Sequence, residues 1–329
     1  MHTGSLRSMR AVQVITTTGP DDIVVTDVPE PVPGPGEVLV EVHSVGIAFP
    51  DLLLSKGMYQ LRPEPPFTLG VDFAGVVVAG EGFEPGQRVA GVGGYGGAAE
   101  LVVGSVENVF PIPDSITFDE AVALPMNYLT ALFALDERGG VQAGDTVLVH
   151  GAAGGVGTAT IQVAKALGAR TIAVASTEEK RAYALAAGAD EAIPVEGFKD
   201  AARELTGGNG VDVVLDVVGG SLFTDSLRAL ARQGRVLVVG FASGEGIPEV
   251  KVNRLLLTNT DIRGVGWGEY AFSHPGYMRQ QWAQLLPMIE SGTVKPPVGK
   301  VYPIEEFGRA LVDMDERATL GKSVVRIRD

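Results

Sequence analysis

The sequence predicts an α/β protein of two domains, in which both chain ends form a partly open β-barrel and a doubly wound parallel sheet is inserted between them. Residues 9–126 contain short apolar runs separated by Gly and Pro, whereas residues 127–264 alternate strand and helix patterns. Residues 265–329 lose that alternation. A chain of 329 residues is long enough for two hydrophobic cores.

Strand signals dominate the first region. Residues 37–43 alternate apolar and polar side chains, and residues 75–79 and 88–92 form apolar runs of strand length. The Pro- and Gly-rich residues 29–36 interrupt the pattern. Short strands at this spacing indicate a barrel rather than strands that alternate with helices.

Strands and helices alternate in the middle region. Glycines such as Gly168 and Gly188 mark the ends of helices. The pattern predicts strands at 146–150, 171–175, 191–193, 211–217 and 235–239, and helices at 157–167, 178–187, 199–205 and 222–231. This order is typical of a parallel sheet with helices on both faces.

The last region has helical patterns at 278–290 and 305–314 and a final strand pattern at 323–328. Because no further strand and helix pairs follow, we expect residues 265–329 to return to the first domain. At the other end, Met9 is a second possible first residue of the protein. Residues 1–8 are therefore interpreted as a leader or as cloning residues and are left out of the fold.

Composition excludes several classes of function. The 26 Lys and Arg against 40 Asp and Glu give a net charge of −14, which disfavours nucleic acid and anionic membranes as partners. The absence of Cys excludes disulfides and thiolate metal sites. No apolar run approaches the ~18 residues of a membrane span. We expect a soluble, cytoplasmic protein.

A glycine-rich loop at 150–157 lies between a predicted strand and a predicted helix. Its Ala152, Gly154 and Gly157 match the dinucleotide-binding pattern except at the first position, where Gly is usual. Bare backbone there lets a pyrophosphate approach the helix N-terminus, so the loop predicts a dinucleotide site. The alternative is a glycine-rich turn without a ligand.

The residues after the second strand of this domain favour NADPH. Ser176 and Thr177 offer hydroxyl donors and Lys180 offers a positive charge, which suit a 2′-phosphate, where NAD-selective proteins carry a carboxylate. Two alternatives stay open. Ser176 and Glu179 could form a capping box beside a solvated Lys180, and Glu178 could reach the ribose and favour NAD.

Five motifs together resemble the medium-chain dehydrogenase/reductase superfamily, over residues 9–328. They are PGPGEVLV at 33–40, FPDL at 49–52 with GMY at 57–59, LGVDFAG at 69–75, NYLTA at 127–131 and the glycine loop. The chain is most similar to the zinc-independent quinone oxidoreductases, the ζ-crystallin-like branch. The resemblance implies a GroES-like barrel, 9–126 with 265–329, and a Rossmann NADP-binding domain at 127–264.

The resemblance also implies a cofactor site. The pyrophosphate would bind the backbone of Gly154, Gly155 and Val156. The nicotinamide would lie in the cleft between the domains, near Asn127, Thr130, Phe241, Val265, Gly266 and Trp267. Lys322 is similar to a family lysine near that cleft, and a surface lysine is the alternative. A homodimer through the edge strand at 260–264 is expected on the resemblance alone.

Neither family zinc site can be built from these residues. The catalytic ligands of zinc-dependent relatives fall at positions that match Ala48, Val71, Asp72 and Met126, of which only Asp72 can bind a cation. The four cysteines of the structural lobe are missing. The scattered His2, His43, His150 and His274 are expected to be structural. We predict no zinc.

Without a Lewis acid, the site suits acceptors with an electron-poor conjugated carbon, namely quinones and α,β-unsaturated ketones. Tyr59 matches the tyrosine that enoyl-thioester reductases of the superfamily use near the developing enolate, and an aromatic pocket wall is the alternative role. Asp51 and Asp72 stand at family positions where turn-capping or interdomain roles are expected. Ala48 replaces an Asn that relatives often carry.

Three other functions remain open. An enoyl-thioester (enoyl-CoA) reductase would need a basic entrance for the coenzyme phosphates, and no Lys/Arg cluster provides one. An NADPH-binding protein that recognises RNA, as described for some ζ-crystallin-like relatives, conflicts with the acidic balance. A redox-silent structural protein is the third. The sequence therefore favours an NADPH-dependent quinone or enone reductase.

Overall fold

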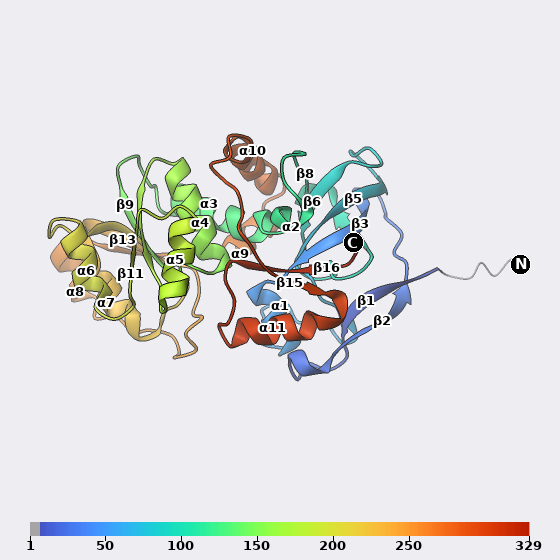
Figure 1. Cartoon of the computed structure of the whole chain (residues 1–329), viewed down its shortest axis with the longest axis horizontal. Coiled ribbons are helices and arrows are strands. Elements are labelled where there is room, and N and C mark those ends of the chain that lie inside the picture. The colour runs from blue at the N-terminus through green and yellow to red at the C-terminus, as the bar shows by residue number, and fades with distance from the viewer. Residues whose placement is uncertain (1–6, 329) are drawn as a thin grey trace, which may run out of the picture. The chain divides into compact units, whose positions relative to one another are not determined.

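The computed structural model describes residues 7–328, which form two compact units (Figure 1). The first unit combines the chain up to Met126 with the chain from Pro296 onward, and the second runs from Asn127 to Lys295. A barrel unit made from both chain ends and an inserted unit with a parallel sheet confirm the predicted fold class.

The first unit, the barrel unit, contains two sheets. One has the order β2-β1-β4, and the other has the order β15-β16-β3-β5-β6-β8, with β7 also paired to β3. Their bounds are β1 Ser8–Val14, β2 Ile23–Pro29, β3 Glu37–Gly46, β4 Phe67–Thr68, β5 Asp72–Gly80, β6 Arg88–Val92, β7 Leu101–Ser105, β8 Val109–Pro111, β15 Val298–Pro303 and β16 Lys322–Arg326. Strand β3 buries Val38, Val40 and Val42, as its alternating sequence requires.

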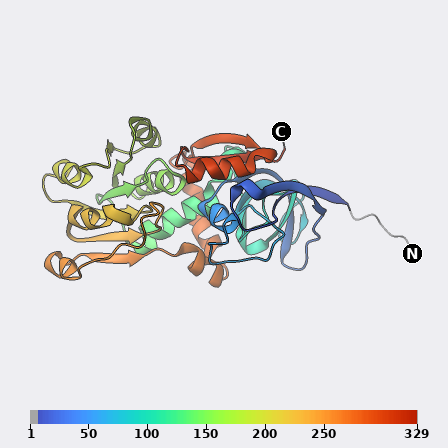
Figure 2. The same ribbon diagram turned by 90° about the horizontal axis from the view of Figure 1, so that it is seen from below.

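Among residues 7–328, the barrel unit also contains the α-helices α1 (Phe49–Ser55), α2 (Phe118–Ala121) and α11 (Phe307–Asp315). Helix α2 begins with a capping box in which Thr117 and Glu120 satisfy each other's backbone N–H. Helix α11 lies beside β15, and both are red in Figure 2.

The C-terminal part of the barrel unit differs from the sequence prediction in one respect. Strands β15 and β16 pair in parallel and are joined through α11, so this segment is a βαβ unit. The sequence pattern misses β15 because that strand contains Gly299, ends at Pro303 and buries only Tyr302 of its six residues. A half-exposed strand of this composition has no clear apolar alternation.

Residues 265–295 belong to the second unit, whereas the sequence pattern predicts a return to the barrel at residue 265. Helices α9 (Trp267–Ser273) and α10 (Tyr277–Glu290) pack against α3 (Leu129–Leu132). Gln281 links all three, because its side chain accepts from Trp267 Nε1 (2.7 Å) and donates to the carbonyl of Leu129 (3.1 Å). A contact 152 residues apart in the chain leaves no local signal in the sequence.

The second unit, the sheet unit, contains one six-stranded parallel sheet of order β11-β10-β9-β12-β13-β14. This is the Rossmann order, which reverses between β9 and β12. The bounds are β9 Thr146–His150, β10 Arg170–Val174, β11 Glu191–Ile193, β12 Val211–Asp216, β13 Leu230–Val238 and β14 Asp261–Gly264. The predicted doubly wound sheet is confirmed.

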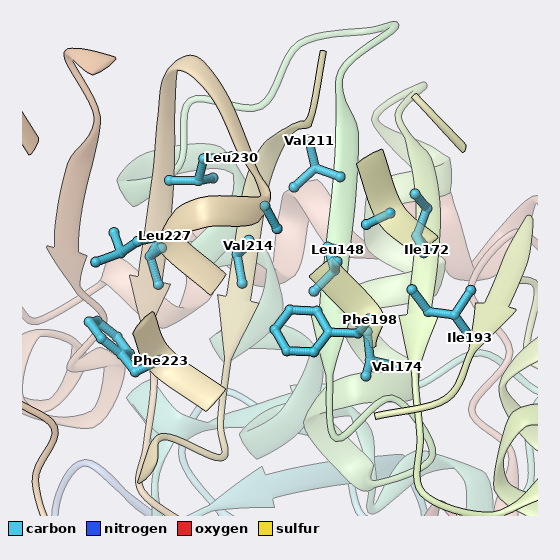
Figure 3. Close-up of a cluster of buried hydrophobic side chains, with 13 residues drawn as sticks. Leu148, Ile172, Val174, Ile193, Phe198, Val211, Val214, Phe223, Leu227 and Leu230 are labelled. Carbon is cyan, nitrogen blue, oxygen red and sulfur yellow. The ribbon is translucent and has the colours of Figure 1, made fainter. Parts of the chain in front are cut away.

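Helices cover both faces of this sheet, as alternating strands and helices require. They are α4 (Gly155–Ala166), α5 (Glu178–Ala186), α6 (Phe198–Leu205), α7 (Phe223–Ala229) and α8 (Asn253–Thr258). A buried cluster joins α6 and α7 to the strands; Figure 3 shows Phe198 of α6 next to Leu148 and Val174. Two π-helical turns, η3 (Leu124–Tyr128) and η4 (Phe133–Arg138), flank α3.

The structure describes only part of the extension that the sequence predicts at residues 1–8. Residues 1–6 of the proposed 1–8 extension lie outside the described residues. Ser8, however, is the first residue of β1 and pairs with Pro29 of β2, so that part of the segment belongs to the fold. Between residues 7 and 328, no helix combines the length and apolar character that a bilayer span requires.

Candidate functional site

The glycine loop connects the last residue of β9, His150, to the N-terminus of α4. Gly151 has φ +61°, which favours glycine, and its carbonyl accepts from the N–H of Gly154 (2.9 Å). At Gly157 a Cβ atom would lie 2.3 Å from the Gly151 oxygen, so only glycine permits this approach of helix and loop. The first backbone N–H groups of α4 have no partner within the helix and can bind an anion.

Asn127 lies against this helix N-terminus. A Cβ atom on Gly155 would lie 2.4 Å from Asn127 Nδ2, so the bare backbone of Gly155 makes room for the amide. Thr130 follows in α3, and both side chains are buried. The structure therefore brings Asn127 together with Gly154, Gly155 and Val156.

A pocket of about 680 Å³ opens beside the carboxyl ends of β10 and β11. Ser176 and Arg181 line one side, and the loop after β11, residues 194–197, lines another. Because ligands of open α/β sheets bind at the carboxyl ends of the strands, this pocket is the candidate site for the adenosine end of a dinucleotide.

Arg181 is a pocket residue that the sequence reasoning missed. Its Nη1 donates to the carbonyl of Ala175 (3.3 Å), directly after β10. Thr177, not Ser176, caps α5, because Thr177 Oγ accepts from the N–H of Lys180 (3.1 Å). The expected capping box of Ser176 and Glu179 is therefore wrong, and Ser176 is left facing the pocket. A basic residue in the first turn of α5 is the signal that could have identified Arg181.

The predicted nicotinamide contacts follow β13 and β14. The N–H of Val265 donates to the carbonyl of Val238 (2.9 Å), and Gly266 is the N-cap of α9. The Trp267 indole is buried and donates to Gln281. Phe241 is partly exposed and its ring lies against Gly219, where a Cβ atom would be 2.9 Å from it.

Asp51, Asp72 and Lys322 are among the ionisable side chains that the barrel unit buries. Asp51 and Asp72 are 0 % exposed and Lys322 is 4 % exposed. Asp51 accepts from the N–H groups of Ala48 (3.1 Å) and Gly70 (2.9 Å), which gives it the turn-capping role expected from the sequence.

The partners of Asp72 are the N–H of Met126 (3.1 Å) and Lys322 Nζ (2.5 Å). Lys322 is thus neither a surface lysine nor free to bind a phosphate directly, because Asp72 engages its ammonium.

Burial governs the protonation of these carboxyl groups. It raises the pKa of Asp51 to about 7, against the opposing effects of the Gly70 N–H and the Lys322 charge. Burial also raises the pKa of Asp72, although Lys322 and the Met126 N–H favour its ionised form. A shared cation therefore compensates only part of the desolvation of two carboxylates.

Tyr59 follows α1 and is half-buried. Burial raises the pKa of its phenol, and the charge of Asp51 adds to the effect. Such a phenol stays protonated at neutral pH and can donate a hydrogen bond. Exposed apolar side chains precede and follow it, notably Phe49, Met58 and Leu61. This stretch can therefore offer an apolar surface with one hydroxyl donor.

The residues at the family zinc positions do not fit zinc. Ala48, Val71 and Met126 have no nitrogen, carboxylate or thiolate ligand, and Asp72 is bonded to Lys322. Within residues 7–328, no three His, Asp or Glu side chains are grouped so as to hold a metal ion. His2 lies outside the described residues.

Two family models match the chain. The model described as "Alcohol dehydrogenase GroES-like domain" matches residues 34–114. The model described as "Zinc-binding dehydrogenase" matches residues 155–291 and so includes α9 and α10. The description of the second model refers to a metal for which the side chains above provide no ligand set.

Similar proteins cover nearly the whole chain. "Quinone oxidoreductase-like protein 2" of Bos taurus is 39 % identical over 91 % of this chain and 87 % of its own. A probable oxidoreductase from Mycobacterium abscessus has a TM-score of 0.89 at 44 % identity, covering 98 % of this chain and 100 % of that one. The quinone oxidoreductase of Thermus thermophilus, solved also as its complex with NADPH, has a TM-score of 0.85 at 35 % identity, covering 97 % and 100 %.

Proposed function

Since the chain belongs to the medium-chain dehydrogenase/reductase superfamily, in its quinone oxidoreductase branch, we propose that it uses NADPH to reduce a quinone or an α,β-unsaturated carbonyl compound without zinc. The main support is that two features occur together in the sheet unit. One is a helix N-terminus at Gly154–Val156 that is formed by glycine backbone, and the other is a pocket lined by Ser176 and Arg181. The two features are suited to a pyrophosphate and to an additional phosphate.

Residues of the sheet unit would hold the cofactor, which supplies the hydride when bound. The N–H groups of Gly154, Gly155 and Val156 would bind the pyrophosphate. Asn127, Thr130, Phe241, Val265, Gly266 and Trp267 would surround the nicotinamide, as the resemblance implies. Lys322 would act only indirectly, through Asp72.

The 2′-phosphate would be held by Ser176, Thr177 and Lys180, as the sequence predicts, and also by Arg181; of these four, Ser176 and Arg181 line the pocket. The Thr177 oxygen accepts from the N–H of Lys180, which leaves the hydroxyl proton available for a phosphate oxygen. Glu178 and Glu179, like Thr177 and Lys180, do not line the pocket, so the preference for NADPH rests on Ser176 and Arg181. The carboxylates of Glu196, Asp200 and Asp225 do line the pocket. Asp200 is paired with Lys199 (3.3 Å) and Asp225 with Arg228 (2.8 Å).

Tyr59 would donate a hydrogen bond or a proton to the reduced acceptor, and its apolar neighbours would contact the acceptor's conjugated system.

The net charge of −14 disfavours both an enoyl-CoA thioester and RNA as ligands. A chain without Cys has no need of an oxidising compartment, and we place the enzyme in the cytoplasm.

A screen of NADPH and NADH oxidation against quinones, enones and enoyl thioesters, with EDTA present, tests the proposal. We expect turnover with NADPH and the first two classes. Arg181→Ala should raise the KM for NADPH roughly 10-fold or more, the effect of losing a charged hydrogen bond, and leave the KM for NADH unchanged. Lys180→Ala is the matched comparison, with a smaller effect of the same kind. Equal effects on both cofactors, or turnover of thioesters alone, would contradict the proposal.

We also propose that the chain forms a homodimer through β14, the strand at the edge of the sheet. This strand ends the sheet. Val252, the N-cap residue of α8, and Leu256 and Leu257 within that helix are exposed. An open strand edge beside an apolar patch suits a second copy of the chain. Sedimentation should show a dimer that dissociates on Leu256→Glu with Leu257→Glu. A wild-type monomer at micromolar concentration would contradict it.

A further inference from the structure

Two buried polar side chains lie side by side where the sheet order reverses. His150 ends β9 and Asp216 ends β12, and each is 1 % exposed. These strands pair in parallel with Val149 beside Leu215, so the next residue of each strand, His150 and Asp216, lies on the opposite face of the sheet from that pair. That face is covered by α6 and α7, since the His150 ring packs edge-on against Phe198 with 4.7 Å between centroids.

The hydrogen bonds of Ser226 in α7 fix which nitrogen of His150 carries the proton. Ser226 Oγ donates to the carbonyl of Leu222 (3.0 Å) and lies 2.8 Å from His150 Nε2. Because a serine hydroxyl has one proton, Oγ must accept from Nε2–H. Burial lowers the pKa of His150 to about 4, so the ring is neutral and Nδ1 is an acceptor.

Only one of the two carboxylate oxygens of Asp216 has hydrogen-bond partners. Its Oδ1 accepts from the N–H groups of Val218 (2.8 Å) and Gly219 (2.9 Å). Within residues 7–328, neither Asp216 Oδ2 nor His150 Nδ1 has a hydrogen-bond partner. Both atoms are acceptors, so they cannot bond to each other, and two buried acceptors without a donor cost free energy.

We propose that His150 Nδ1 and Asp216 Oδ2 bind one internal water molecule, which donates a hydrogen to each, and that this bridge positions the two loops that leave β9 and β12. Water is the smallest donor with two hydrogens, and a buried polar site with two or more partners is where proteins hold it. The site uses no residue assigned above to the cofactor or the acceptor.

The positioning role rests on the proposed function, because the two loops that the water would join are those assigned to the cofactor. His150 directly precedes the glycine loop, whose end forms the N-terminus of α4. Asp216 shapes the loop of Val218 and Gly219, against which Phe241 lies. A bridge between the two strand ends thus couples the pyrophosphate loop to a predicted nicotinamide contact, and its residues are positioning residues.

The chain supplies variants that separate this role from general stability. In Asp216→Asn, the amide oxygen can keep both backbone N–H bonds while Nδ2 donates to the water, which still donates to His150 Nδ1, so the bridge is retained. His150→Phe removes the acceptor and leaves Asp216 Oδ2 unpaired. Asp212→Asn is the control, because Asp212 Oδ2 accepts from the Thr146 N–H (2.8 Å) at the opposite ends of the same strands.

Equilibrium binding of NADPH tests the positioning role. We expect His150→Phe to raise the Kd at least 5-fold, Asp216→Asn to stay within 2-fold of the wild type, and Asp212→Asn to change unfolding without changing the Kd. A folded His150→Phe protein with wild-type Kd would overturn the positioning role.

Nitrogen-15 NMR and a high-resolution crystal structure test the water site without any activity. With four His in the chain, the spectrum should show one buried ring protonated at Nε2 that disappears in His150→Phe. Density for a water should contact His150 Nδ1 and Asp216 Oδ2, remain in Asp216→Asn, and be absent in His150→Phe. A ring protonated at Nδ1 that bonds directly to Asp216 would overturn the site. Failure of the enzyme to oxidise NADPH would reject the proposed function but not this result.

Discussion

The two units bury ionisable groups whose pKa values shift in opposite directions. The barrel unit buries Asp51 and Asp72 with a single ammonium, that of Lys322, whereas the sheet unit buries a neutral His150 beside Asp216. Burial raises the pKa of Asp51 to about 7 and lowers the pKa of His150 to about 4. In both units the low-dielectric interior favours the neutral form, so the two units should respond to pH with opposite signs.

The largest effect should come from the shared cation of the barrel unit. Lys322→Met leaves Asp72 and Asp51 buried without a compensating charge, which should lower the free energy of unfolding of the barrel unit by about 3–5 kcal/mol at pH 8. The loss should shrink as the pH falls to 5, because Asp51, with a pKa of about 7, is then neutral, and burial also raises the pKa of Asp72. Urea unfolding at both pH values checks this, and an equal loss at both would show that charge is not the cause.

The protonation of Asp51 should give the barrel unit a negative slope of stability with pH. A pKa raised from 3.8 to about 7 means that its stabilising contribution is complete below pH 4 and is lost as pH rises through 7. The shift corresponds to about 4 kcal/mol. Asp51→Asn should remove this slope, whatever it does to the absolute stability. A wild-type slope that persists in the variant would refute the assignment.

His150 should give the sheet unit the reverse slope. A pKa lowered from 6.5 to about 4 means that the unfolded chain binds a proton that the folded unit does not, so stability is complete above pH 6.5 and falls as pH decreases toward 4. The expected loss is about 3 kcal/mol. Unfolding of the sheet unit, followed at several pH values, should become flatter between pH 4 and 6.5 in His150→Phe. An unchanged slope would mean that another group titrates.

The smallest effect should come from a matched ion pair at the surface of the barrel unit. Lys56 and Asp315 are 2.5 Å apart, as close as Lys322 and Asp72, but their side chains are 29 % and 47 % exposed. Lys56→Met should change the free energy of unfolding by less than about 1 kcal/mol, because water screens the pair. If Lys56→Met lowers the free energy of unfolding as much as Lys322→Met does, burial does not determine how much an ion pair contributes to stability.

Local patterns in the sequence were sufficient for much of the sheet unit. Strands such as Thr146–His150 alternate with helices, and a glycine loop between a strand and a helix is typical of a dinucleotide site. Neither the pairing of Lys322 with Asp72 nor that of Gln281 with Leu129 has a local signal, because 250 and 152 residues separate the partners.

The candidate site was predicted less completely. The glycine backbone and Ser176 were found because each follows a strand in the pattern, but Arg181 enters the pocket only through the direction of its side chain. His150 was interpreted as an ordinary structural histidine. Its tautomer depends on Ser226, 76 residues away, which no spacing rule in the sequence shows.

Transfer of deuterium tests the central claim most directly. NADPH carrying deuterium at the transferring C4 position of the nicotinamide is incubated with the EDTA-treated protein and an α,β-unsaturated ketone, and the product is analysed by mass spectrometry and NMR. The account predicts a saturated ketone with one deuterium on the β-carbon, and a slower or absent reaction with NADH. A product without deuterium, or turnover that requires added zinc, would contradict it.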